Sequence, residues 1–230
     1  MAIKLEQVVP FGRSLREYQA MFDLSSYDLS KRILGVGDGP ASFNAEMTAL
    51  GHSVLSIDPL YQFTGQEIKR QFDAVVDGII AQVRSTPADW VWAYHKSPED
   101  LKNNRMAALE SFLADYDQGK NQNRYQIGEL PYVSEVTDMS FELALCSHFL
   151  FLYAEHFDLE FHQSAIMDML HVAPEVRIFP LMTLEGQRSV YVKPIVQFLR
   201  GLGYEVGIQK VPYELQRCGN EMLWIRGAVN

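Results

Sequence analysis

The amino-acid sequence predicts an α/β fold in which seven strands form a mostly parallel sheet with helices on both faces. Three observations lead to this prediction. Short apolar runs alternate with helical patterns along the 230 residues, as expected for strands joined by crossover helices. A glycine-rich turn follows the first apolar run. The last two strand-like segments have no helix between them, so they are expected to form an antiparallel hairpin.

The first half of the chain is expected to contain two short strands and a long helical region. Strands are predicted over 33–36 and 53–57. The helix between them should begin at Pro40, whose nitrogen has no hydrogen to leave unpaired, and should be capped at Gly51. Helical patterns then continue over 65–117. Because one helix suffices for a crossover connection, we expect this stretch to be a helical insertion, either a lid or a subdomain, within a single domain.

The second half supplies the remaining strands. The segment 141–147 contains three consecutive apolar residues, which is typical of a strand covered on both faces. Helical spacing is found over 161–170 and again over 192–202. The strands are expected at 125–128, 141–147, 175–181, 204–211 and 221–226.

The charge of the chain disfavours two classes of partner. A formal net charge of -9 at pH 7 provides no long-range attraction to nucleic acids or to anionic membranes, although a local basic patch would change this. The most apolar stretch, 143–154, is too short to span a bilayer. Glu6 lies where a signal peptide needs an apolar run. We therefore expect a cytoplasmic protein that binds neither nucleic acid nor membrane, and the oligomeric state stays open.

The histidines do not predict a metal site. His162 and Asp168 lie six residues apart on a predicted helix, so they would not share one face. His95, His156 and His171 are scattered along the chain. No metal cofactor is expected.

Three glycines lie near the end of the first predicted strand and in the turn that follows it. Residues 33–41 are Ile-Leu-Gly-Val-Gly-Asp-Gly-Pro-Ala, and glycine at such a turn lets a ligand approach the backbone. Asp58 ends the next strand, where a carboxylate can accept hydrogen bonds from both hydroxyls of a ribose. The order of strand, turn, helix, strand and acid favours an adenosine-type ligand at the carboxyl edge of the sheet. The alternative is a glycine turn beside a capping aspartate with no ligand.

This turn resembles motif I of class I S-adenosylmethionine-dependent methyltransferases, typically Leu-Asp-x-Gly-x-Gly-x-Gly. Gly37 and Gly39 take the first two glycine positions, with Asp38 between them. The dinucleotide fingerprint of nicotinamide enzymes fits less well, because it requires Gly or Ala where this chain has Pro40.

The chain departs from the methyltransferase motif at two positions. Gly35 stands where the family has an acid, and Ala41 stands where it has the third glycine. In the family the acid helps to fix the glycine loop and often the methionine end of the cofactor. Its replacement keeps open the alternative of a noncatalytic protein that binds S-adenosylmethionine.

The resemblance extends from about Lys31 to Arg226 and implies cofactor contacts outside the glycine loop. Asp58 matches the acid that binds the ribose, and the two residues after it would line the same edge. The end of the third strand is the best match for the position that faces adenine. Segment 140–148 resembles the family's fourth-strand segment. The cofactor residues that the resemblance implies are Gly35, Gly37, Asp38 and Gly39 in and before the turn, and Asp58, Pro59, Leu60, Glu129, Leu130, Cys146 and Ser147 elsewhere.

The family's chemistry requires few catalytic groups. The cofactor is the methyl donor, so the protein mainly orients the acceptor and excludes water. A base is needed only if the acceptor must lose a proton. His148, just past the fourth strand, is the candidate because histidine titrates near neutrality, with a structural histidine as the alternative.

The resemblance implies transfer of a methyl group from S-adenosylmethionine to an unidentified small-molecule acceptor. Two alternatives stay open. One is a noncatalytic or regulatory protein that binds the same cofactor. The other is a nicotinamide-dependent oxidoreductase, which Pro40 and the terminal hairpin disfavour.

Overall fold

The computed structural model describes residues 10–133 and 141–227. The strands are β1 (Ile33–Val36), β2 (Val54–Ile57), β3 (Tyr125–Gln126), β4 (Leu143–Ser147), β5 (Glu175–Phe179), β6 (Glu205–Lys210) and β7 (Glu221–Arg226). The helices are α1 (Leu15–Phe22), α2 (Ser26–Leu29), α3 (Phe43–Ala49), α4 (Gly65–Ser85), α5 (Pro98–Asn121), α7 (Leu159–Val172) and α8 (Val192–Gly201). Two short 3-10 helices are η1 (Pro59–Gln62) and η2 (Pro87–Asp89).

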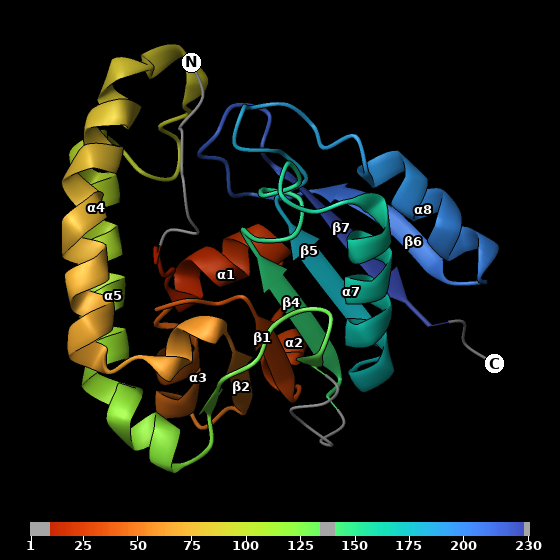
Figure 1. Ribbon diagram of the computed structural model, residues 1–230, viewed down its shortest axis with the longest axis horizontal. Helices are drawn as coiled ribbons and strands as arrows, with labels where there is room; N and C mark the ends of the chain where they lie inside the picture. The colour runs from red at the N-terminus through yellow and green to blue at the C-terminus, as the bar shows by residue number, and fades with distance from the viewer. Residues whose placement is uncertain (1–9, 134–140, 228–230) are drawn as a thin grey trace.

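The seven strands form one sheet in the order β3-β2-β1-β4-β5-β7-β6 (Figure 1). Strands β1 to β5 pair in parallel, whereas β7 is antiparallel to both β5 and β6. The predicted fold, a mostly parallel sheet that ends in an antiparallel hairpin, is confirmed.

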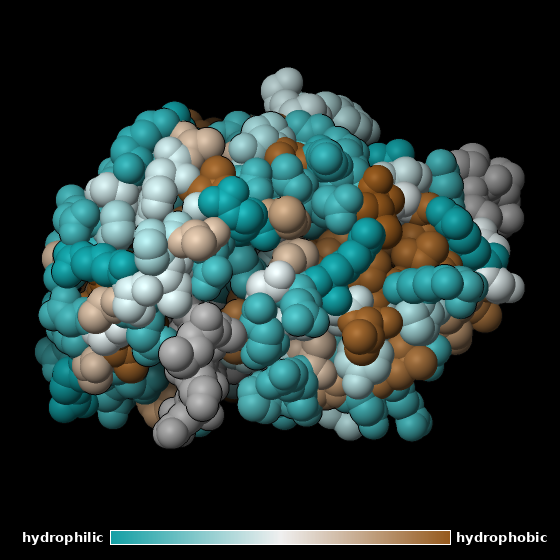
Figure 2. Space-filling model, turned by 90° about the horizontal axis from the view of Figure 1, so that it is seen from above, coloured by the Kyte–Doolittle hydropathy of each residue, from teal (hydrophilic) through white to brown (hydrophobic). Residues whose placement is uncertain are grey.

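Apolar side chains cover both faces of the sheet. Successive residues of a strand point to opposite sides, so a strand of consecutive apolar residues places side chains on both faces. In β4, Leu143 and Leu145 pack in the cluster that also contains residues of α1 and α3. Ala144 and Cys146 belong to the opposite cluster, with residues of α7 and α8. The sheet is therefore the middle of three layers. In the view of Figure 2, hydrophilic side chains predominate on the side of α4 and α5, and a hydrophobic patch lies on the other side.

Helices α4 and α5 lie side by side at the β3 end of the sheet (Figure 1). Helix α5 contacts α3 and β3, whereas α4 packs mainly on α5. In their hydrophobic cluster, Phe112 and Tyr116 of α5 lie against Tyr61 and Tyr125. Helix α5 thus serves as the crossover helix between β2 and β3, and α4 with its connection is the addition. Whether this helical pair acts as a lid stays a prediction.

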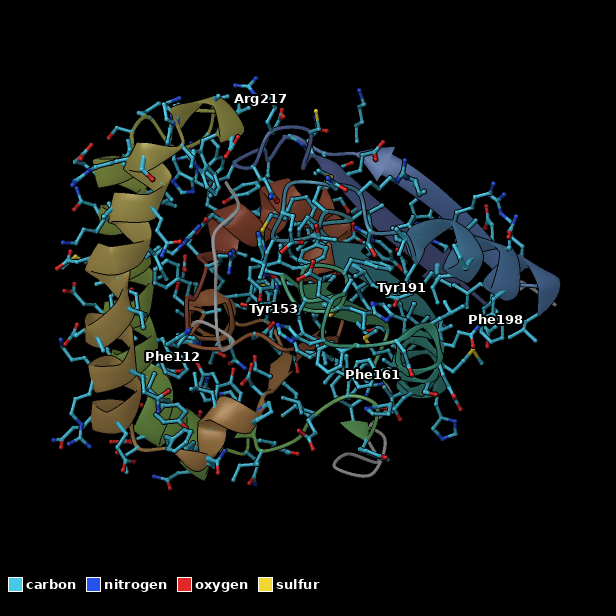
Figure 3. All side chains as sticks on the ribbon, turned by 45° about the horizontal axis from the view of Figure 1, so that its top comes forward. Phe112, Tyr153, Phe161, Tyr191, Phe198 and Arg217 are labelled. Carbon is cyan, nitrogen blue, oxygen red and sulfur yellow. The ribbon has the colours of Figure 1, made fainter. Side chains whose placement is uncertain are left out.

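The loop between β6 and β7 reaches the connection between α4 and α5. Arg217 makes most of this contact, at the top of the view in Figure 3. Its backbone N–H donates to the carbonyl of Asp89 at 2.8 Å, and its Nε donates to the carbonyl of Ala88 at 2.8 Å. The backbone N–H of Val91 donates to the carbonyl of Leu215 at 2.8 Å. Two segments from opposite edges of the sheet are therefore joined above its carboxyl ends.

The start of α3 differs from the prediction. The helix begins at Phe43, after Ser42, and Pro40 lies in the preceding loop. This loop packs tightly against the N-terminal segment, since a Cβ added to Gly12 would lie 1.9 Å from the carbonyl oxygen of Pro40. Pro40 and Ala41 therefore continue the glycine-rich loop rather than begin the helix.

Candidate functional site

A cavity of about 870 Å³ lies at the carboxyl ends of β1, β2 and β4. Ligands of open α/β sheets bind at this edge, and the volume is in the range of small-molecule sites. The N-terminal segment contributes Phe11 and Arg13 to its wall. Helices α4 and α5 contribute Ile79, Val83 and Arg105, so the added helix forms part of the wall.

The structure brings most of the predicted site residues together. The predicted cofactor residues that line the cavity are Gly37, Asp38, Gly39, Asp58, Pro59, Leu60, Glu129, Leu130 and Ser147, and the predicted catalytic residue His148 also lines it. Two predicted cofactor residues, Gly35 and Cys146, do not line it. Both assignments are corrected below.

Gly35 is needed to make room for the carboxylate of Asp38. A Cβ at position 35 would lie only 1.8 Å from Oδ2 of Asp38, so the side chain of Asp38 folds back over Gly35. The hydroxyl of Tyr18 donates to its Oδ1 at 2.6 Å, and Ser56 Oγ donates to its Oδ2 at 2.7 Å. The acid expected at position 35 is thus replaced by one three residues later, whose carboxylate occupies the space above Gly35.

Cys146 belongs to the core rather than to the cofactor wall. Its side chain is fully buried in the cluster between the sheet and α7. Strand alternation explains this, because Ser147, the next residue, faces the cavity instead. Burial raises the pKa of the Cys146 thiol to about 12, so it is not a reactive thiolate at neutral pH.

Asp58 joins the end of β2 to the glycine loop. Its Oδ2 accepts a hydrogen bond from the backbone N–H of Gly39 at 2.8 Å, and its Oδ1 accepts one from Leu60 at 2.7 Å. Each oxygen has a second lone pair available to a ligand. Burial raises the pKa of Asp58, while these two backbone hydrogen bonds act in the opposite direction.

Within the described ranges, neither the buried carboxylate of Asp38 nor the half-buried carboxylate of Asp58 has a cationic partner. The ion pairs found there include neither Asp38 nor Asp58. Burial raises the pKa of Asp38 to about 6, and the nearby charge of Asp58 contributes to the increase. Two carboxylates without an ion-pair partner therefore lie at the glycine loop, where they favour a positively charged group or hydroxyl donors of a ligand.

The glycine loop requires glycine at two positions. Gly37 has φ +68° and Gly39 has φ +55°, conformations that other residues rarely adopt. A Cβ at Gly37 would lie 3.2 Å from Cβ of Phe149, whereas no atom lies within 4 Å of one at Gly39. Gly37 thus serves the turn itself. At Gly39 the space beside Cα is open, while its N–H and its carbonyl are bonded to Asp58 and to the hydroxyl of Tyr61.

His148 lies at the end of β4 with φ 52°. Its backbone N–H donates to the carbonyl of Phe179 at 2.6 Å, and its Nδ1 lies 3.0 Å from Oγ of Ser147. Burial lowers the pKa of His148 well below its usual value, and the charges of Arg13 and Arg105 lower it further. The expectation that it titrates near neutrality is therefore wrong. It is a neutral imidazole at physiological pH.

A buried ion pair closes the end of the cavity beside His148. Arg105 of α5 donates from Nη1 and Nη2 to the two carboxylate oxygens of Glu17 in α1, at 2.9 and 2.8 Å. The hydroxyl of Tyr213 lies 3.3 Å from Oε1 of Glu17, and Nε2 of His95 lies 3.3 Å from the same oxygen. Both charged side chains are fully enclosed. The pair attaches α5 to the first helix across the end of the site.

Arg13, Arg105 and Tyr213 were not predicted as residues of the site. A signal for Arg105 was present, because it lies on the apolar face of its helix between Leu101 and Ala108. A charged residue at such a position is expected to have a buried partner. The sequence contains no comparable signal for Arg13 or Tyr213, which lie in irregular segments.

Aromatic side chains form one wall of the cavity. Phe157 and Phe161 stack at 4.2 Å between ring centroids, and Phe149 lies 5.5 Å from Phe157. Figure 3 shows Phe161 on α7 and Tyr153 in the loop before that helix. Trp90, between α4 and α5, also contributes to the lining. The cavity therefore offers a mainly apolar surface to a ligand.

No group of three or more metal-ligating side chains was found in the described residues. His162 and Asp168 have structural roles. The ring nitrogens of His162 lie 2.6 and 3.0 Å from the carbonyl oxygens of Asp158 and Leu150. Asp168 accepts a hydrogen bond from the backbone N–H of Val133. Among the residues that the structure describes, no helix is both long enough and apolar enough to cross a membrane.

The strand order, with β7 as the antiparallel strand, is that of the class I methyltransferase fold. The chain is 31% identical over 225 residues to the uncharacterized protein MJ0045 of Methanocaldococcus jannaschii, and the alignment covers 97% of this chain and 98% of that protein. It belongs to the same family as this archaeal protein. No family model matches the sequence.

Solved structures with a similar fold include methyltransferases. A magnesium protoporphyrin IX methyltransferase from Synechocystis PCC 6803 with bound SAM has a TM-score of 0.48 and 13% identity, over 93% of this chain and 78% of that one. An O-methyltransferase family protein from Burkholderia thailandensis has a TM-score of 0.49 and 11% identity, over 94% of this chain and 58% of that one.

Proposed function

We propose that this protein transfers a methyl group from S-adenosylmethionine to a small-molecule acceptor. The observation that carries the proposal is the connection between Asp58 and the glycine loop through the N–H of Gly39, at the cavity on the carboxyl edge of the sheet. A carboxylate that would accept hydrogen bonds from ribose hydroxyls therefore lies next to the open space at Gly39. Both features belong to the fold's nucleoside-binding edge.

The charges around the loop support this cofactor over a nicotinamide dinucleotide. S-adenosylmethionine has a sulfonium and an ammonium group, whereas a dinucleotide places a pyrophosphate against the glycine loop. Asp38 and Asp58 both line the cavity at this loop. Two carboxylates there attract a cationic ligand and repel a pyrophosphate. The two carboxylates therefore disfavour a pyrophosphate at the glycine loop itself, while the cationic Arg13 lines another part of the same cavity.

The chain's own residues would bind and orient the two ligands. Asp58 would accept hydrogen bonds from the ribose, and Leu60 and Leu130 would pack against the adenine. Asp38, fixed by Tyr18 and Ser56, would lie near the amino-acid end. The bound cofactor supplies an electrophilic methyl group, so positioning and exclusion of water are the protein's main contributions. As a neutral imidazole, His148 would contact the acceptor and accept a proton only weakly.

The acceptor is proposed to be small. The cavity is large enough for a cofactor and a small second molecule, and the net charge of -9 disfavours nucleic acid as a substrate. A cytoplasmic location also stays a prediction.

Calorimetric titration with S-adenosylhomocysteine tests the proposal. The ligand should bind and raise the melting temperature. The Asp58→Ala variant should lose roughly 1–3 kcal/mol of binding free energy, because hydrogen bonds to a charged acceptor are removed. Asp77→Ala, on an exposed part of α4, is the matched control and should bind as the wild type does.

Three outcomes would each contradict a part of the proposal. Tight binding of NADH without binding of S-adenosylhomocysteine would favour the oxidoreductase. Wild-type affinity in Asp58→Ala would remove Asp58 from the site. Cofactor binding with no turnover across broad acceptor panels would instead favour the noncatalytic alternative.

A further inference from the structure

We infer that Arg13 binds a carboxylate group that a ligand brings into the cavity. The inference rests on the proposed function for the identity of the cofactor, but the charge balance that motivates it does not depend on that identity. Arg13 lies in the segment before α1, outside every motif recognised in the sequence.

The backbone holds Arg13 beside the glycine loop. The preceding residue, Gly12, packs against Pro40, and its carbonyl accepts a hydrogen bond from Nη1 of Arg105 at 3.3 Å. The side chain of Arg13 lines the cavity. Its Nη1 donates to the carbonyl of Phe11 at 2.7 Å, while its Nε is buried and has no hydrogen-bond partner.

The neighbouring acid does not neutralise Arg13. Both oxygens of Glu17 are bonded to Arg105, and its Oε2 also accepts a hydrogen bond from the backbone N–H of Ser14 at 3.0 Å. Among the described residues Arg13 belongs to no ion pair. Burial lowers its pKa and so does the charge of Arg105, whereas Tyr213, Glu17 and Tyr18 act in the opposite direction.

Two arginines and one glutamate therefore meet at this end of the cavity, with one positive charge in excess. Arginine stays protonated in proteins, and a buried charge without a partner is costly to the folded state. The cost is removed when an anionic ligand binds. His148, the other basic side chain close to Arg13, is neutral and adds no charge.

The guanidinium group of Arg13 is a better match for a carboxylate than for a phosphate. A guanidinium offers planar, parallel N–H groups that match the two oxygens of a carboxylate. A doubly charged phosphate would need a second free cation, but Arg105 is bound to Glu17. The nearby lining is aromatic, with Phe11, Phe149 and Tyr213. A singly charged group on an apolar molecule suits these surroundings.

Two ligands could bring this carboxylate, namely the amino-acid part of the cofactor and an acidic acceptor. Titration calorimetry on wild type, Arg13→Met and Arg13→Lys distinguishes them. The cofactor probes are S-adenosylhomocysteine and 5′-methylthioadenosine, which lacks the amino-acid part. The acceptor probes are benzoate and cinnamate against their neutral amides, with and without S-adenosylhomocysteine. The control is Arg16→Met, which removes an equal charge at an exposed position of α1.

If the carboxylate belongs to the cofactor, Arg13→Met should bind S-adenosylhomocysteine roughly 10- to 100-fold more weakly, as expected for charge-assisted hydrogen bonds. Binding of 5′-methylthioadenosine should not change. If it belongs to the acceptor, S-adenosylhomocysteine should bind normally, and the preference for benzoate or cinnamate over the amides should disappear. In either case Arg13→Lys should be intermediate, because it keeps the charge without the planar fork, and Arg16→Met should match the wild type.

The inference is overturned if no carboxylate-bearing probe binds Arg13→Met more weakly than it binds the wild type. Stability gives an independent check. Because Arg13 lacks a counter-ion, the ligand-free Arg13→Met protein should melt no lower than the wild type, and a clearly lower melting temperature would count against an uncompensated charge. If wild type fails to bind S-adenosylhomocysteine, the proposed function fails, while the aromatic carboxylates still test Arg13 on the cofactor-free protein.

Discussion

The two ends of the cavity are built in different ways. At the end formed by β1 and β2, the carboxylate of Asp58 is bonded to two backbone N–H groups, and all of these residues belong to one strand-helix-strand segment. At the other end, Arg105, Glu17 and Tyr213 meet from three distant segments and are held by buried charge. The first end depends on local chain geometry. The second depends on the whole fold being in place.

This difference predicts where substitutions act. Changes at the first end should mainly alter ligand binding, because the backbone contacts hold the loop without a charged pair. Changes to the Arg105–Glu17 pair at the second end should mainly alter stability, since removing one charge leaves its partner buried and unpaired. Changes at Asp38 should affect both ligand binding and stability, because this residue lies in the glycine loop but is held by the distant side chains of Tyr18 and Ser56.

The largest effect is expected for Arg105→Met. The variant leaves Glu17 buried without its main partner, which should destabilise the protein by roughly 3–5 kcal/mol, measurable by urea unfolding at pH 7. The double variant Glu17→Gln with Arg105→Met should recover much of this loss, because neither member of the pair is left buried alone. Equal stability of the single and double variants would show that charge does not hold this end together.

A smaller effect is expected for Asp38→Asn, and it should depend on pH. The pKa of Asp38 is raised from 3.8 to about 6 in the folded protein, so its ionised form destabilises the fold. This loss of stability develops as the pH rises from about 4 to 6 and is complete above 6, where it amounts to roughly 3 kcal/mol. Asp38→Asn should therefore be more stable than the wild type at pH 8 and similar to it at pH 4. A difference that does not vary between these pH values in urea unfolding would contradict this expectation.

The smallest of the three effects is expected for Gly35→Ala. Its Cβ would overlap the carboxylate of Asp38, and such overpacking typically costs about 1–3 kcal/mol. Introducing the same change into an Asp38→Gly background should cost much less, because no carboxylate is left to displace. A double-mutant cycle of thermal or urea unfolding measures this coupling. Additive effects would mean that the two positions do not share this space.

Most of the fold, and the end of the site formed by Asp58 and the glycine loop, could be predicted because the signals for both are local in the sequence. Strand periodicity, the glycine turn and Asp58 are local signals, and parallel strands bring their carboxyl ends together. The prediction for Gly35 failed because the position of Asp38 depends on Tyr18 and Ser56, which lie outside the motif. Arg13 was missed because only the tertiary fold shows that it has no counter-ion.

The contact between the β6–β7 loop and the α4–α5 connection has a consequence for how this family varies. Arg217 and its neighbours bond to the backbone of residues 88–91, so the lengths of the two loops are matched. Loops usually change length independently among homologues. Here an insertion in one loop would break its contact with the other. Family members that shorten or lengthen the α4–α5 connection are therefore expected to show a compensating change in the β6–β7 loop.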